Sequence, residues 1–127
     1  MQKPLAKPSV DVRRGPHYSR NIEQLRKQHP SVEQDVEAAM QDVIVPAVIA
    51  DPINPYKQAG GTPVILGTYS KRVANSSGAT GRRGGFRLLY HWDRHKKRLT
   101  LLAISLRRDR VGFPASAVTN LLKHAGI

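Results

Sequence analysis

The chain contains no cysteine among its 127 residues. Thiol catalysis, cysteine-based zinc sites and disulfide scaffolds are therefore excluded, and a chain of this length can bury enough core to fold without them. Aromatic residues make up only 6% of the sequence, and no apolar run approaches the ~18 residues that a membrane span needs. The opening residues are basic without an apolar run behind them, which predicts a short flexible arm over residues 1–8 and not a secretory signal. We expect one cytoplasmic domain over residues 9–127.

Acidic residues are also scarce. The sequence has nine Asp and Glu and 21 Lys and Arg, which gives a formal net charge of +12. Five of the acids fall between Ser31 and Pro52, a stretch that has no Lys or Arg. Twelve Lys and Arg lie between Lys71 and Arg110, with only two acids among them. Such a balance indicates nucleic acid, an anionic membrane surface or an acidic protein as partner. The segregation places the cationic surface in the second half of the chain.

Periodicity in the first half predicts one strand and two helices. Residues 9–14 alternate in polarity, as a strand does, and residues 18–28 carry apolar side chains at helical spacing. A second helix begins at Ser31, which we expect to form a capping box with Gln34. Pro46 is expected to end or kink this helix.

The second half predicts three strands and a closing helix after a long loop. Prolines and glycines mark the loop, residues 50–67. The expected strands span residues 68–74, 85–92 and 98–106, and the closing helix spans 114–124. The fold class is therefore α+β in the order β-α-α-β-β-β-α, a small, mainly antiparallel sheet with a helical hairpin packed on one face.

The segment from Ser70 to Trp92 reads SKRVANSSGATGRRGGFRLLYHW and carries five cations on one hairpin. Together with the segments LTLLAIS and LRRDR that follow, and with the order of elements, it resembles the RelE/ParE-like superfamily of bacterial toxins from toxin–antitoxin pairs. The RelE/HigB-like branch is the most similar, and the resemblance covers residues 10–122. It implies a sheet with helices on one face and a basic groove on the other.

The resemblance also implies an activity and partners. Members of the branch cleave mRNA in the ribosomal decoding site without a metal or another cofactor, and a cognate antitoxin inhibits them. Arg87 matches the catalytic arginine of the Gly-Gly-aromatic-Arg strand, Arg72 matches a basic residue of the preceding strand, and Arg108 matches the arginine after the apolar strand. Phe113 stands near the position where a tyrosine or histidine often follows, and a phenyl ring cannot exchange a proton.

Metal-free RNA cleavage needs a proton acceptor for the attacking 2′-hydroxyl and positive charge for the phosphorane that forms. Arginine suits the second task, which we assign to Arg87 and Arg108, unless Arg87 pairs with a carboxylate such as Asp93 or Asp109. Lys71 and His91 are the candidate proton acceptors. Lys71 faces the other side of the strand from Arg72. His91 shares the face of Arg87 about 13 Å away, and it also fits a half-buried histidine without a chemical role.

Further cations are expected to contact the RNA backbone, or else to lie on solvated turns. They are Arg82 and Arg83 in the glycine-rich loop, Arg94, Lys96 and Lys97 in a turn, and Arg107 and Arg110 after the last strand. The remaining histidines lack metal-ligand spacing, so we expect no metal site. Two other functions stay open, namely a basic module that binds RNA or the ribosome without cutting, and a ParE-like gyrase inhibitor.

Overall fold

The computed structural model describes residues 10–65, 67–76, 85–106 and 115–127. The arm expected over residues 1–8 lies outside this part of the chain. The elements, in chain order, are β1 (Asp11–Arg14), α1 (Pro16–Gln28), α2 (Val32–Ala39), a π-helical turn η1 (Met40–Ile44), α3 (Val45–Ala50), α4 (Tyr56–Ala59), β2 (Thr62–Ile65), β3 (Thr68–Val73), β4 (Phe86–Asp93), β5 (Arg98–Leu106) and α5 (Ala115–His124).

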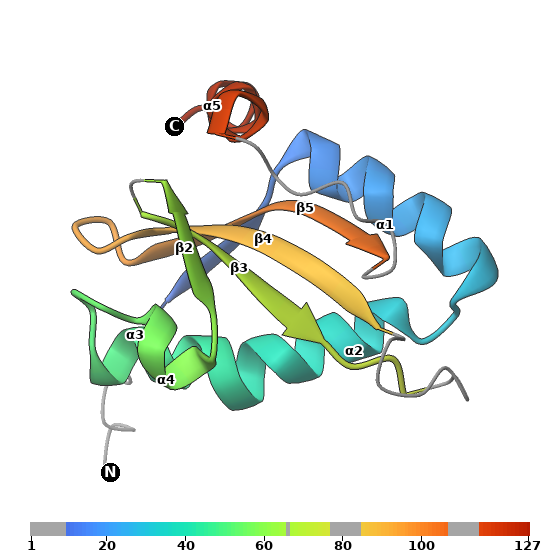
Figure 1. Ribbon diagram of the computed structural model, residues 1–127, viewed down its shortest axis with the longest axis horizontal. Helices are drawn as coiled ribbons and strands as arrows, with labels where there is room; N and C mark the ends of the chain where they lie inside the picture. The colour runs from blue at the N-terminus through green and yellow to red at the C-terminus, as the bar shows by residue number, and fades with distance from the viewer. Residues whose placement is uncertain (1–9, 66, 77–84, 107–114) are drawn as a thin grey trace, which may run out of the picture.

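The strands form one five-stranded sheet in the order β1-β5-β4-β3-β2 (Figure 1). Strand β1 pairs with β5 in parallel, and the other three pairings are antiparallel. The expected α+β class and the mainly antiparallel sheet are confirmed. Strand β4 lies at the centre of the sheet and is hydrogen-bonded to a strand on each side. Side chains on both of its faces pack against other parts of the fold.

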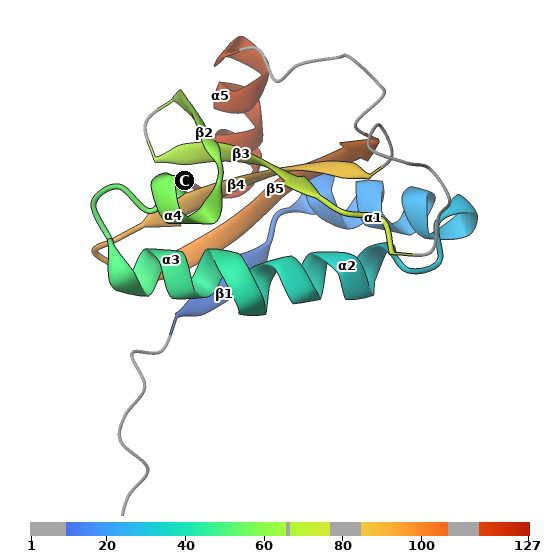
Figure 2. The same cartoon turned by 60° about the horizontal axis from the view of Figure 1, so that its bottom comes forward.

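One face of the sheet carries the main core. Alternation along β4 turns Phe86, Leu88, Tyr90 and Trp92 toward helices α1 to α3, and all four are buried. Those helices and the π-helical turn η1 contribute to the same cluster Tyr18, Ile22, Val32, Val36, Met40, Ile44 and Val48. Figure 2 shows α2 and α3 running along this face, with α5 on the other side of the sheet.

The described residues cover the opposite face only in part. Leu89, Leu102 and Ala103 pack there against Val118 of α5, and side chains of β2 border the cluster. A register shift after Leu89 places one extra residue in β5, so that both Leu102 and Ala103 join this cluster. The part of this face nearest the start of β4 holds polar side chains instead.

The expectation of a loop over residues 50–67 was wrong, because this stretch contains helix α4 and strand β2. Helix α4 ends where Gly60 adopts a left-handed conformation with φ +70°. Pro63 fits strand β2 because β2 is an edge strand of the sheet, where one side needs no backbone donor. The glycines and prolines of this stretch thus mark the ends of α4 and the edge strand β2, and they do not form one long loop.

The second helix continues past Pro46, and the expected capping box at its start was wrong. Pro46 does not end it, because the wider π-helical turn before α3 accommodates a residue that has no backbone N–H. Ser31 makes no side-chain cap to the backbone, and its hydroxyl donates instead to Asp35 Oδ2 at 2.8 Å. Asp35 in turn accepts from the backbone N–H of Ser76 at 3.1 Å, which ties the start of α2 to the end of β3.

Candidate nucleic-acid interface

Two arginines lie directly opposite each other on the partly covered face of the sheet. Arg72 of β3 is the cross-strand partner of Arg87 of β4, and paired residues in an antiparallel ladder point to the same side. Val73 and Phe86, the next pair, point into the main core. This alternation forces the two guanidinium groups onto the face that helices α1 to α3 leave free.

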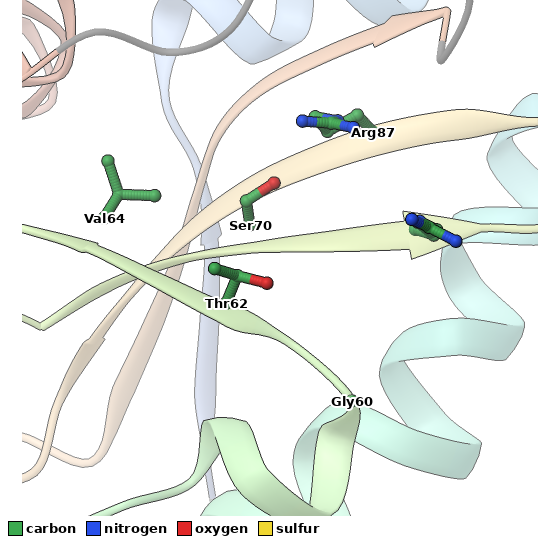
Figure 3. Close-up of a pocket in the computed structure, with 6 residues that line it drawn as sticks. Gly60, Thr62, Val64, Ser70 and Arg87 are labelled. Atoms are coloured by element: carbon green, nitrogen blue, oxygen red, sulfur yellow. The ribbon is translucent and has the colours of Figure 1, made fainter.

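The arginine pair borders a hollow of about 370 Å³. Its lining residues are Gly60, Thr62, Val64, Ser70, Arg72 and Arg87. Figure 3 shows the side chains of Thr62 and Ser70 on neighbouring strands, with Arg87 standing above the sheet beside them. Two hydroxyl groups and two guanidinium groups, all able to donate hydrogen bonds, therefore surround one space. We call it the arginine hollow.

The charge of the arginine hollow is uncompensated within the part of the chain that the structure describes. Neither Arg72 nor Arg87 forms an ion pair with any residue of that part. Asp93 accepts hydrogen bonds from the backbone N–H groups of His95 and Lys96, so the alternative pairing of Arg87 with Asp93 does not occur. Like charges placed opposite each other repel, and an anion between the two guanidinium groups would relieve that repulsion.

Lys71 lies outside the arginine hollow although it is next to Arg72 in sequence. Its cross-strand partner is Leu88, which faces the helices, so Lys71 lies on the other side of the strand, as expected. The Lys71 ammonium donates a hydrogen bond to the carbonyl of Ala59, the last residue of α4. Burial lowers the pKa of this amine below its ordinary value. The contact anchors the turn that begins with Gly60, and Gly60 is part of the hollow's wall.

His91 shares the face of Arg87 but is separated from it by a buried residue. Leu89 stands between them on β4 and is fully covered by the cluster that includes Val118 of α5. The imidazole is half-buried beside Gly67, and its Nδ1 has no hydrogen-bond partner among the described residues. Burial lowers the pKa of His91, with the Asp93 carboxylate opposing part of that shift. The structure therefore does not bring His91 to the arginine hollow.

The turn cations lie at the far end of β4. Arg94, Lys96 and Lys97 occupy the exposed turn between β4 and β5, whereas Arg87 lies near the start of β4. Seven residues of extended strand separate Arg87 from Arg94, a distance of about 23 Å. The described cations Arg72 and Arg87 thus lie at the opposite end of the sheet from those of the turn.

Several predicted site residues lie outside the described part of the chain. They are Arg82, Arg83, Arg107, Arg108 and Arg110, together with Phe113 and Asp109. The structure therefore places Arg72, Arg87, Lys71, His91 and the cations of the turn, and brings together only Arg72 and Arg87.

Sequence reasoning missed one wall of the arginine hollow. Thr62 and Val64 belong to strand β2, which was expected to be loop, and Gly60 ends the helix before it. The signal available was TPVI, a short run with three β-branched residues directly after Gly60-Gly61, but its proline argued against a strand. Recognising an edge strand there would have placed Thr62 beside Ser70, its partner in the ladder.

The described residues contain no group of three or more His, Cys, Asp or Glu side chains that could hold a metal ion. Within the same ranges, every helix is too short or too polar to cross a membrane. In comparisons with known proteins, no family model and no curated protein matched the chain.

Proposed function

We propose that this chain is a RelE-like toxin that binds mRNA through the arginine hollow, cleaves it on the ribosome in the cytoplasm and is inhibited by a cognate antitoxin. The observation that carries the proposal is the cross-strand pair of Arg72 and Arg87, which lacks a counter-ion within the described residues and borders an open hollow. Guanidinium groups bind phosphate oxygens with two parallel hydrogen bonds, and a pair of them suits a phosphodiester.

The reaction would begin with a ribose 2′-hydroxyl attacking the adjacent phosphorus. A bond forms from the 2′-oxygen to phosphorus, the bond from phosphorus to the 5′-oxygen breaks, and the products are a 2′,3′-cyclic phosphate and a 5′-hydroxyl. Arg72 and Arg87 would stabilise the additional negative charge of the phosphorane between these events. Ser70 and Thr62 would donate hydrogen bonds to the phosphate or to neighbouring ribose oxygens.

The proton of the 2′-hydroxyl needs an acceptor, and the leaving 5′-oxygen needs a donor. The described lining of the arginine hollow offers hydroxyl and guanidinium groups, which are poor bases near neutral pH. Lys71 and His91, the expected acceptors, lie on the other side of β3 and behind Leu89. This observation favours a second candidate function, a basic module on the same fold that binds RNA or the ribosome without cutting it.

A translation assay tests the leading proposal. Purified chain is added to a cell-free translation reaction, and breaks in the mRNA are mapped by primer extension. We expect wild type to slow translation and to produce ribosome-dependent breaks, and Arg87→Ala to abolish both. Arg20→Ala serves as the matched control, because Arg20 is an exposed arginine of α1, on the helical side of the sheet.

The same assay separates the two functions. Slowed translation without breaks, combined with salt-sensitive RNA binding that Arg87→Ala weakens, would support the non-catalytic module. Breaks that persist in Arg87→Ala would contradict the assignment of the arginine hollow. If wild type neither slows translation nor binds RNA, both functions are wrong.

A further inference from the structure

A second hollow, of about 670 Å³, opens at the other end of the sheet from the arginine hollow. Its lining comes from the segment after α3, from the beginning of β3, from the end of β4 with its following turn, and from residue 127. The residues that matter below are Ile53, Trp92, Arg94 and Ile127. We call it the isoleucine hollow.

The isoleucine hollow presents aliphatic side chains to water. Ile53 is 66% exposed and Ile127 is 47% exposed, and they are two of the four large apolar side chains that the described residues leave exposed. Single exposed apolar residues need no explanation, but two that border one concavity mark a candidate interaction site. A partner that covers this apolar surface removes it from water, and that transfer contributes favourable free energy to binding.

Ile53 is held in this position by hydrogen bonds. Asp51 Oδ1 accepts from the backbone N–H groups of Ile53 at 3.2 Å and Asn54 at 3.0 Å, which forms an Asx turn. Trp92 Nε1 donates to the carbonyl of Pro52 at 3.0 Å and ties this turn to β4. These hydrogen bonds hold the backbone that carries the exposed Ile53 side chain. A partner therefore does not have to order this turn when it binds, which lowers the entropic cost of association.

The isoleucine hollow is bordered by Arg94, which belongs to a cationic turn. Arg94, Lys96 and Lys97 are all exposed on the turn that follows β4. Asp93, the acid nearest to them in sequence, accepts hydrogen bonds from the backbone N–H groups of His95 and Lys96, at 3.0 and 3.1 Å. Asp93 also lines the hollow and keeps its negative charge. Three cations stand against this one carboxylate between residues 93 and 97, so the turn remains net positive toward an anionic partner.

The chemistry of the lining distinguishes a polypeptide from a nucleic acid. RNA-binding surfaces stack bases on exposed aromatic rings, but Trp92 and Tyr69 in this hollow are only 7% and 8% exposed. Beside the exposed polar side chains of Arg94 and His95, the exposed lining is made of isoleucines, for which nucleic acids carry few matching apolar groups. An apolar side chain flanked by carboxylates complements both the isoleucines and the cationic turn.

We infer that the isoleucine hollow docks an acidic polypeptide segment, which inserts an apolar side chain beside Ile53 and Ile127 and pairs its carboxylates with Arg94 and Lys96. This surface is separate from the arginine hollow, since about 23 Å of strand β4 lies between Arg87 and Arg94. A bound segment would therefore leave the arginine hollow open. The inference does not depend on what the arginine hollow binds.

The test is a selection from a random peptide library displayed on phage, with the full chain immobilised. We expect the enriched peptides to combine Leu, Ile or Phe with neighbouring Asp or Glu. Synthetic copies should bind Ile53→Ser/Arg94→Ser about tenfold more weakly than wild type, the effect of losing one anchor of an interface. Ile49→Ser/Arg20→Ser is the matched control, because both side chains are exposed and lie on α3 and α1. It should bind the peptides as wild type does.

Enriched peptides without acids, peptides that bind both variants equally, or a selection that enriches nothing would each overturn the inference. All substituted side chains are exposed, and circular dichroism with thermal melting verifies that the variants fold. RNA binding is measured in parallel on Ile53→Ser alone, which removes no cation, and should match that of wild type. The peptide titration therefore tests the isoleucine hollow, and the RNA titration tests the proposed function separately.

Discussion

Removing both arginines of the arginine hollow should weaken RNA binding in a way that salt can diagnose. The perturbation is Arg72→Ala/Arg87→Ala, which deletes two guanidinium groups that face the same space across the β3–β4 ladder. Hydrogen bonds to charged groups contribute about 1.5 to 3 kcal/mol each, and an exposed pair contributes less. Arg72 is exposed and Arg87 is half-buried. We therefore assign about 1 kcal/mol to Arg72 and about 2 kcal/mol to Arg87, which together weaken binding about a hundredfold.

The salt dependence should change by a calculable amount. Each phosphate contact to a single strand contributes about 0.7 to the slope of log affinity against log salt concentration. The double variant should therefore reduce that slope by about 1.4. The assay is fluorescence anisotropy of a labelled single-stranded RNA, titrated with protein at several potassium chloride concentrations.

The matched control removes the same charge from the helical side of the sheet. Arg20→Ala/Lys27→Ala replaces two exposed cations of α1, where alanine also favours the helix. It should leave the slope within about 0.3 of the wild-type value, because these cations make no direct phosphate contact in this account. Equal losses of affinity in the two double variants would refute the reasoning, since net charge alone would then explain binding. An unchanged slope in Arg72→Ala/Arg87→Ala would refute it as well.

Three further predictions concern stability. Gly85 has φ +111°, and a Cβ there would lie 2.7 Å from the Val73 carbonyl oxygen, so Gly85→Ala should cost about 2 to 3 kcal/mol in urea unfolding. Burial lowers the pKa of His91 in the folded state. The residue therefore favours the folded state above its ordinary pKa, and this contribution to stability is lost as the pH falls through the folded-state pKa. Because asparagine does not titrate, His91→Asn should flatten the decline of the unfolding free energy below about pH 6.5. The Tyr90 hydroxyl is buried without a hydrogen-bond partner among the described residues, so Tyr90→Phe should change stability by less than about 1 kcal/mol, whereas Phe86→Ala should cost about 3 to 5 kcal/mol.

Each of these has a contradicting result. A Gly85→Ala protein as stable as wild type would mean that the approach to Val73 relaxes without cost. His95→Asn, at an exposed turn position, is the comparison for His91→Asn, and equal pH profiles in the two would contradict a specific effect of burial. A large loss of stability in Tyr90→Phe would show that its hydroxyl has a partner.

The sequence predicted the long, strongly patterned elements of the fold well. Strands β3, β4 and β5 follow from alternation or from a continuous apolar run, and the face assignment along β4 holds because a central strand is constrained on both sides. Short edge elements failed. Helix α4 and strand β2 contain too few residues for a period to register, and tertiary pairing with β3 fixes them instead of local preference.

In the candidate site, too, local alternation was predictable from the sequence, whereas contacts between distant segments were not. The resemblance singled out Arg72 and Arg87, whereas alternation placed Lys71 on the opposite side of β3, which the ladder confirms. Sequence alone could not show that Thr62 borders the hollow, since that depends on β2 pairing with β3. It also could not show that Leu89 and α5 separate His91 from Arg87, because packing between distant segments has no signature in local spacing.

The most direct test of the central claim follows the guanidinium groups themselves. Nε–Hε resonances of the arginines are assigned by NMR and followed while a short single-stranded RNA is added, with 2′-deoxy sugars that prevent cleavage. The account predicts that the signals of Arg72 and Arg87 shift together and saturate at one RNA concentration, while that of Arg20 stays in place. Shifts confined to other arginines, with Arg72 and Arg87 unmoved at saturation, would contradict it.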